Sequence, residues 1–267
     1  MKKIIYSVSM LSIGLLGVSC NNDDDTINDN NNNKKLLKEF KEKFNNGDIA
    51  VTKYNYNPSD SSLNKIDLFR NDTLISSNEY KYLNSKTVTE TNYFYYNNQK
   101  KELYTITHQL ADDFVKSTFK YKNLDSIVNN QPNFNISSNE TSSYFNNKCG
   151  IYKLISKDYN SDNPNDSSTN ETIYTPKSND CNFVSIFQEG KEIGNIQYIG
   201  VNPFPSIFDY FKVIKKGNLK SVNYYDEYLK DFNHKQDYTF DSNNYPITST
   251  TSYFNNTSNS VTTYSYY

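Results

Sequence analysis

The sequence predicts a mostly β protein, built as one long antiparallel meander that curves into a sheet or a partly closed barrel. One reason is composition: the 267 residues include 25 Tyr and 16 Phe, which favour strands and supply a core. A second is that aromatic pairs recur two positions apart, which places both rings on one face of a strand. A third is that Asn-rich and Asp-rich turns follow these pairs, as in β-hairpins.

Residues 1–19 have the pattern of a signal peptide. Lys2 and Lys3 precede a mostly apolar run that is too short to span a bilayer stably. The run ends in "GVSC", which resembles the lipobox of bacterial lipoproteins, although Gly17 stands where Leu is usual. The resemblance implies that Cys20 is acylated and becomes the new N-terminus. The alternative is a plain secretory signal that ends beside a cysteine.

Residues 20–33 are expected to form a disordered polar tether, because they contain too little apolar surface to fold. Asp23, Asp24 and Asp25 resemble the export signal of Bacteroidota surface lipoproteins, which directs them to the outer face of the outer membrane. Asn21 follows the cysteine, so the inner-membrane retention signal of other bacteria is missing. The alternative is a merely polar linker.

Residues 34–267 are expected to form a single antiparallel β domain. Its first segment, "KKLLKEFKEKFNNG", predicts a short N-terminal helix, because its apolar residues recur at helical spacing and Gly47 offers a stop. These apolar residues are Leu36, Leu37, Phe40 and Phe44.

After this segment the apolar period changes to two, which predicts strands. "YYNNQKKELY" and "FDSNNYPI" are hairpin-like turns, since Asn tolerates a positive φ. The aromatic pairs that share a strand face are Tyr80 and Tyr82, Tyr93 and Tyr95, Phe119 and Tyr121, and Tyr238 and Phe240.

Two segments break the strand pattern. Residues 156–172 are rich in Asn, Asp and Ser and predict a loop. Residues 206–215 predict a short helix that Ser206 caps and Gly217 ends. This helix is expected to plug or flank the sheet.

The last third of the chain, with "YTFDSNNYPITSTTSYF" and "TTYSYY", resembles the YD-type repeats of uncharacterised Bacteroidota lipoproteins. Those chains often carry an Asn-Pro-Phe segment before their last hairpins, as at Asn202, Pro203 and Phe204. Asn244 stands where the family usually has Gly. The resemblance implies a surface lipoprotein of antiparallel β-structure and implies no reaction.

Cys149 and Cys181 remain once Cys20 is acylated. Two cysteines in an exported chain predict a disulfide that closes the Asn-rich and Asp-rich loop. A pair of buried free thiols is the alternative.

The same loop approaches a calcium motif, with Asp158, Asn160, Asp162 and Asp166 at the first, third, fifth and ninth places. Thr169 stands where the motif needs a bidentate Glu, so a solvated loop explains the pattern better. We therefore expect no metal site and no cofactor.

Catalytic residues are not expected. His108 lies in an alternating segment and is interpreted as a half-exposed sheet residue, and His234 as a turn residue. No nucleophile elbow, phosphate loop or paired-His metal motif occurs. The net charge is −2, or −4 without Lys2 and Lys3, and positive charges do not cluster, which excludes a nucleic-acid partner.

Exposed Tyr and Asn on a rigid sheet favour a noncatalytic role: binding a glycan or protein ligand, or a structural part in the envelope. The membrane partner is the lipid at the N-terminus. The runner-up is a glycan-active or other hydrolytic enzyme, because glycoside hydrolysis needs only two carboxylates.

Three tripeptides, "DTI", "DTL" and "DSI", resemble the O-glycosylation acceptor of Bacteroidota. The resemblance implies that Thr26, Thr73 and Ser126 carry sugars.

Overall fold

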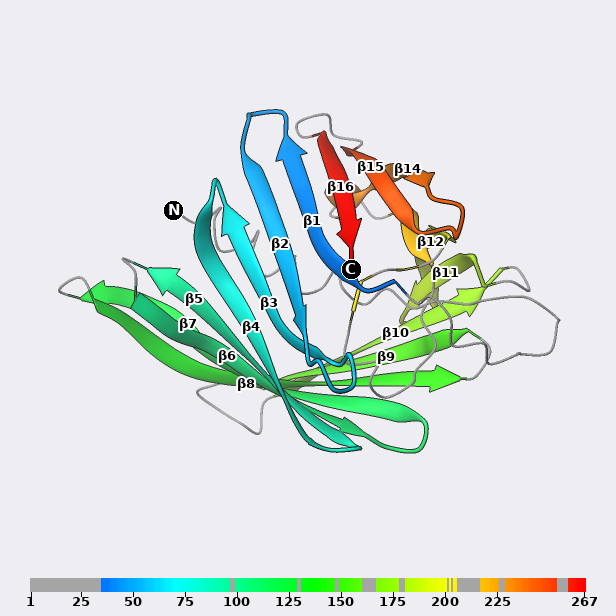
Figure 1. Ribbon diagram of the computed structural model, residues 1–267. Coiled ribbons are helices and arrows are strands. Elements are labelled where there is room, and N and C mark those ends of the chain that lie inside the picture. The colour runs from blue at the N-terminus through cyan, green and yellow to red at the C-terminus, as the bar shows by residue number, and fades with distance from the viewer. Residues whose placement is uncertain are drawn as a thin grey trace.

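The protein is a closed antiparallel β-barrel in the computed structural model (Figure 1). The structure describes residues 35–96, 99–128, 131–146, 149–159, 167–177, 181–200, 202, 204–205, 217–225, 229–253 and 259–267. These residues form sixteen strands, each paired with its neighbours in sequence, and β1 closes the ring with β16. The predicted meander is therefore confirmed, and it closes completely.

The first eight strands are β1 (Leu37–Phe44), β2 (Ile49–Tyr56), β3 (Leu63–Arg70), β4 (Thr73–Asn84), β5 (Thr87–Tyr96), β6 (Gln99–Leu110), β7 (Phe114–Val128) and β8 (Gln131–Asn146). The last eight are β9 (Gly150–Tyr159), β10 (Ser167–Pro176), β11 (Phe183–Gln188), β12 (Lys191–Ile199), β13 (Asn218–Tyr224), β14 (His234–Phe240), β15 (Pro246–Tyr253) and β16 (Ser260–Tyr266). A single 3-10 turn, η1 (Lys230–Phe232), precedes β14 among the described residues.

The predicted N-terminal helix is wrong, because residues 37–44 form strand β1. Phe40 and Phe44 fit a helical spacing, but they also alternate with Lys41 and Lys43, as a strand requires. β1 pairs with β2 on one side and with β16 on the other, for example Phe40 with Tyr264. A helix here would leave two strand edges unpaired, so tertiary hydrogen bonding overrides the local pattern.

The described parts of the segment predicted as a loop, residues 156–159 and 167–172, are strand, so the loop prediction is wrong there. β9 continues to Tyr159, and β10 begins at Ser167. The predicted helix at 206–215 and residues 160–166 of the calcium-like motif lie outside the described residues.

Two clusters of buried hydrophobic side chains form the core among the described residues. One contains Leu37, Tyr54, Leu63 and Ile66, and the other contains Val88, Val115 and Ile151. Tyr80 packs against both clusters and joins them.

Phe204 enters this core from the segment that follows β12. Its ring packs edge-on against Phe40, with 5.5 Å between centroids, and against Tyr264 at 6.0 Å. The Asn-Pro-Phe segment therefore places an aromatic side chain inside the barrel.

Asn and Asp form tight turns at positive φ. Asn71 and Asp72 join β3 to β4 with φ of 47° and 63°, and Asn244 lies between β14 and β15 with φ of 60°. Asn244 thus adopts the left-handed conformation in which its Gly equivalent is favoured.

One end of the barrel holds both ends of the described chain. The Tyr267 N–H donates to the Leu36 carbonyl at 3.0 Å, and the Lys35 ammonium lies 2.5 Å from the Asp241 carboxylate. We call this the tether end, because the described chain begins there with Lys35, shortly after the predicted tether of residues 20–33. Strands alternate in direction, so the turns that follow even-numbered strands also lie at this end.

Candidate functional site

Alternation divides every strand between the inside of the barrel and its outer wall. In β1, Phe40, Glu42 and Phe44 point inward, whereas Lys41 and Lys43 are exposed on the outside. Across β1 and β2, Lys41 lies opposite Val51, and Phe40 lies opposite the buried Thr52. The inner face is aromatic, and the outer wall is rich in charge.

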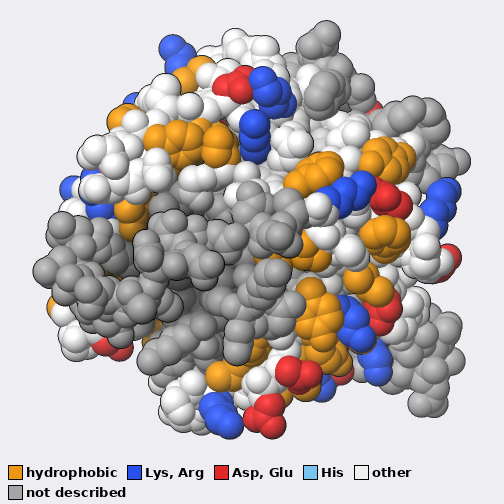
Figure 2. All heavy atoms as spheres, turned by 90° about the vertical axis from the view of Figure 1, so that its right-hand side faces the viewer, with side chains coloured by type: hydrophobic (Ala, Val, Ile, Leu, Met, Phe, Trp, Pro, Cys, Tyr) orange, Lys and Arg blue, Asp and Glu red, His pale blue; other side chains and the backbone are white. Residues whose placement is uncertain are grey.

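Ion pairs occur on the outer wall over most of its circumference. Figure 2 shows one side of it, where hydrophobic side chains are separated by Lys and by Asp or Glu. The pairs and their N–O distances are Lys65–Asp67 (2.9 Å), Lys100–Glu79 (2.6 Å), Lys116–Glu140 (2.8 Å), Lys153–Glu171 (3.4 Å), Lys177–Glu192 (2.9 Å) and Lys235–Asp237 (2.8 Å).

The predicted aromatic pairs whose side chains are both described share a face, but on different sides of the barrel; the Tyr121 side chain lies outside the described part. Tyr80 and Tyr82 pack against the inner core. Tyr93 lies on the outer wall, where the half-exposed Lys100 ammonium sits 3.8 Å from its ring centroid. Tyr238 and Phe240 stack at 5.5 Å on one face of β14.

His108 is buried inside the barrel, not half-exposed as predicted. Its Nδ1 lies 2.8 Å from Ser117 Oγ, and its Nε2 lies 3.6 Å from a Glu90 carboxylate oxygen. The other Glu90 oxygen accepts a hydrogen bond from the Asn78 amide at 2.7 Å. The His108 and Glu90 side chains are 8% and 12% exposed, so this chain of polar groups is enclosed by the wall.

Burial shifts the pKa values of Glu42 and His234. Burial raises the pKa of Glu42 above its usual value, against the opposing effect of a hydrogen bond from Ser260. Burial lowers the pKa of His234, which opens strand β14 and is not the turn residue that was predicted. Its ring packs against Tyr253 at 5.5 Å.

One line of side chains crosses the outer wall at right angles to the strands from β7 to β12. Each member lies directly opposite the next across a strand pair, so the line runs about 24 Å at roughly 4.8 Å per strand. We call it the aromatic row; its members are Phe114, Tyr144, Lys153, Ile173, Phe187 and Glu192.

The side chains of the aromatic row contact one another. The Phe114 and Tyr144 rings are 5.1 Å apart, and the Lys153 ammonium lies 4.8 Å from the Tyr144 ring centroid. Ile173 is 37% exposed, an unusual position for a large apolar side chain. The row is therefore a flat and partly apolar strip on a rigid sheet.

Glu192 ends the row in a polar cluster. Lys177 donates to Glu192 at 2.9 Å, Ser185 donates at 2.9 Å, and Tyr225 donates at 3.3 Å. The hydrogen bond from Lys177, followed by that from Ser185, lowers the pKa of Glu192. The Asn195 amide in turn donates to the Tyr225 hydroxyl at 2.7 Å.

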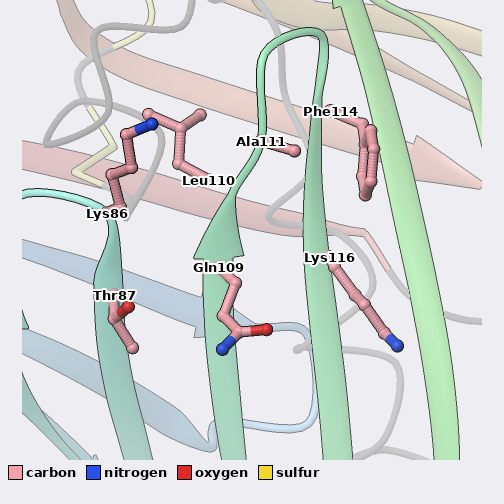
Figure 3. A pocket seen from close by; sticks show the side chains of 7 residues that line it. All are labelled: Lys86, Thr87, Gln109, Leu110, Ala111, Phe114 and Lys116. Atoms are coloured by element: carbon pink, nitrogen blue, oxygen red, sulfur yellow. The ribbon is translucent and has the colours of Figure 1, made fainter.

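A pocket of about 280 Å³ lies at the other end of the row, close to the tether end. Thr87, Gln109 and Lys116 form its outer-wall part, and they are direct neighbours across β5, β6 and β7. Figure 3 shows the lining on these three strands and on the turn between β6 and β7. The remaining lining residues are Lys86, Leu110, Ala111 and Phe114. Phe114 belongs to both the pocket and the row.

The predicted sites are placed as follows. Cys149 and Cys181 are bonded, with 5.7 Å between their Cα atoms, at the tether end. Thr73 is exposed as the first residue of β4, and Ser126 lies within β7. Cys20 and Thr26 lie outside the described residues. The aromatic row and the pocket were missed, because strand register alone brings their residues together.

The part of the chain that the structure describes contains neither a metal-binding cluster nor a membrane-spanning helix. No group of three or more His, Cys, Asp and Glu gathers there to hold a metal ion. Within the same residues, no helix has the length and apolar character needed to cross a membrane.

Comparisons with known proteins find distant structural neighbours. No protein-family model and no curated protein matches the chain. A porin-like protein from Bacteroides uniformis is 12% identical, with a TM-score of 0.36 over 86% of this chain and 96% of its own. A protein of unknown function from Bacteroides fragilis has the same identity and TM-score over 47% of this chain and 92% of its own. Similarity at this level carries no argument about function.

Proposed function

We propose that the protein is a lipid-anchored lipoprotein on the outer face of the outer membrane, and that it binds a ligand on the outer wall of its barrel without catalysing a reaction. The observation that supports it best is the outer wall, where a partly apolar row is surrounded by charged and hydrogen-bonding side chains.

The charges of the outer wall favour a barrel that stands in water beside the membrane. A barrel that spans a membrane presents an apolar band about 25 Å tall to lipid, and Lys at its middle costs about 2–4 kcal/mol. Here the outward positions of β1 and β14 include Lys41, Lys43, Lys235 and Asp237. Anchoring is then left to the lipid on Cys20, whose two or three acyl chains suffice for stable attachment.

The tether sets how far the barrel can lie from the membrane surface. The predicted tether, residues 20–33, has 14 residues, and a flexible chain of this length has a mean end-to-end distance of about 20 Å. The outer wall is therefore accessible to large ligands. Surface export is supported by Asp23, Asp24 and Asp25, and Thr73 is exposed as an O-glycan acceptor must be.

Enclosure of His108 supports a noncatalytic role. A hydroxyl, an imidazole and a carboxylate, the groups of a catalytic triad, lie in sequence at Ser117, His108 and Glu90. Ser117 and His108, however, are each only 6% exposed. A substrate needs direct access to such groups.

A binding panel tests the proposal. Purified lipidated protein is presented on liposomes to a glycan array and to envelope proteins, and Tyr144→Ala is compared with Tyr96→Ala. Tyr96 is a matched control because it is an exposed tyrosine at the end of β5, outside the row. We expect Tyr144→Ala to lose ligands that Tyr96→Ala retains. Capture of no ligand, or equal capture by both variants, would contradict the proposal.

A further inference from the structure

We infer that the pocket and the aromatic row together bind a polysaccharide in which uronic acid units are separated by neutral sugars. One uronate carboxylate occupies the pocket beside Lys86, and the chain continues along the row. This inference rests on the proposed function, because it names the ligand of the same outer wall.

Lys86 supplies the charge recognition. It is exposed, and no carboxylate among the described residues pairs with its ammonium group. Lys116, the other lysine of the pocket, is already paired with Glu140 at 2.8 Å. The pocket therefore has one uncompensated positive charge, which suits one carboxylate.

The rest of the pocket suits a sugar ring. The Thr87 hydroxyl and the Gln109 amide are outward-facing hydrogen-bonding groups on adjacent strands. Leu110, Ala111 and Phe114 provide an apolar surface beside them. Small-molecule sites combine an apolar lining with a few polar groups that fix orientation, and 280 Å³ is near their lower size limit. One sugar ring fits this description better than a larger group.

The aromatic row indicates an extended ligand. It continues from Phe114 through the Tyr144 ring to Phe187, over about 19 Å at roughly 4.8 Å per strand. Its lysine is balanced by a carboxylate, since Lys153 pairs with Glu171 at 3.4 Å. A row without excess charge accepts neutral sugars and disfavours a chain that carries an acid on every unit.

The test uses hyaluronan oligosaccharides of ten sugars, whose uronate units alternate with neutral ones, and the same oligosaccharides with methyl-esterified carboxylates. Binding to the full lipidated protein is measured by titration calorimetry at fixed ionic strength. We expect the ester to bind about tenfold more weakly than the acid, as for loss of one charge-assisted hydrogen bond.

Five variants, two of them controls, locate the site. Lys86→Gln is expected to weaken binding of the acid about tenfold and leave binding of the ester unchanged, and Lys86→Arg is expected to restore the acid. Lys43→Gln is the control, because Lys43 is an exposed outer-wall lysine in β1, far along the ring of strands from the pocket. Phe114→Ala is expected to weaken the binding of both the acid and the ester. Its control is Phe69→Ala, because the Phe69 ring lies outside the row and contacts the Lys53 ammonium.

Equal affinity for acid and ester, or an unchanged affinity in Lys86→Gln, would overturn the inference. So would failure to bind either oligosaccharide. Each of these results leaves the proposed function standing if Tyr144→Ala still loses a ligand in the binding panel, so the two failures are distinguishable.

Discussion

The inner face and the outer wall of the barrel use the same residue types for different purposes. Tyr54, on the inner face, is 2% exposed and lies in the core cluster with Leu37 and Leu63. Tyr93, on the outer wall, lies under the half-exposed Lys100 and remains partly accessible. Aromatic side chains inside the barrel pack in its core, and those on the outer wall remain partly exposed to solvent.

The pKa values of the phenol groups on the inner face are raised by this burial. Burial raises the pKa of Tyr54 well above its usual value, with smaller contributions from Tyr56 and Tyr264. Burial likewise raises the pKa of Tyr264 to about 12. These phenols stay neutral in the physiological range, as side chains of a core should.

The largest effect on stability is expected from truncating a tyrosine side chain on the inner face of the barrel. Tyr54→Ala removes a fully buried ring and should lower the free energy of unfolding by about 3–5 kcal/mol. Tyr93→Ala should cost less than about 1 kcal/mol, since it removes an outer-wall ring and one cation–π contact. Urea denaturation followed by circular dichroism measures both, and equal losses would remove the distinction between the faces.

The disulfide is expected to have the next largest effect. Replacing both Cys149 and Cys181 with Ser removes a cross-link between residues 32 positions apart. Because the unfolded chain then gains conformational entropy, the free energy of unfolding should fall by about 3–4 kcal/mol. The same denaturation experiment applies, with reductant added to the wild type as a second route to the same state. No change in either case would indicate free thiols in the cell.

A smaller, pH-dependent effect is expected at Glu42, a carboxylate on the inner face. Its folded-state pKa is raised by burial, so its contribution to stability is fully present below about pH 4.5 and is lost as the pH rises through the folded value. Glu42→Gln should therefore stabilise the barrel at pH 8 and have little effect at pH 4. Thermal unfolding at both pH values decides this; the same shift at both would be contrary to a buried carboxylate.

The smallest effect is expected from an outer-wall ion pair. The Lys100 and Glu79 side chains are 41% and 40% exposed, so Lys100→Gln should cost less than about 1 kcal/mol, and less still in 0.5 M NaCl. A loss as large as that of Tyr54→Ala would show that the outer wall contributes to the core.

Local sequence patterns were sufficient to predict the meander, the aromatic pairs and the turn at Asn244, because each depends on neighbours along the chain. They could not predict that Tyr82 points inward and Tyr95 outward, since alternation assigns residues to faces without saying which face is buried. β1 was mistaken for a helix because Phe40 and Phe44 satisfy both periods, and only barrel closure decides between them.

Local patterns could not predict the proposed binding site for a related reason. Phe114 and Phe187 are 73 positions apart in sequence, and only the register of four strand pairs places them in one row. The burial of His108 was also not predicted. It depends on which face of β6 lies inside the barrel, and on the hydrogen bond with Ser117 on the neighbouring strand β7.

The behaviour of the Cys20→Ala protein without detergent tests the central claim most directly. If the outer wall faces water and only lipid attaches the barrel, this variant should leave the membrane fraction and remain folded and monodisperse in plain buffer, with a β-sheet circular dichroism spectrum. Retention in the membrane, or aggregation that only detergent reverses, would show that the barrel itself is embedded.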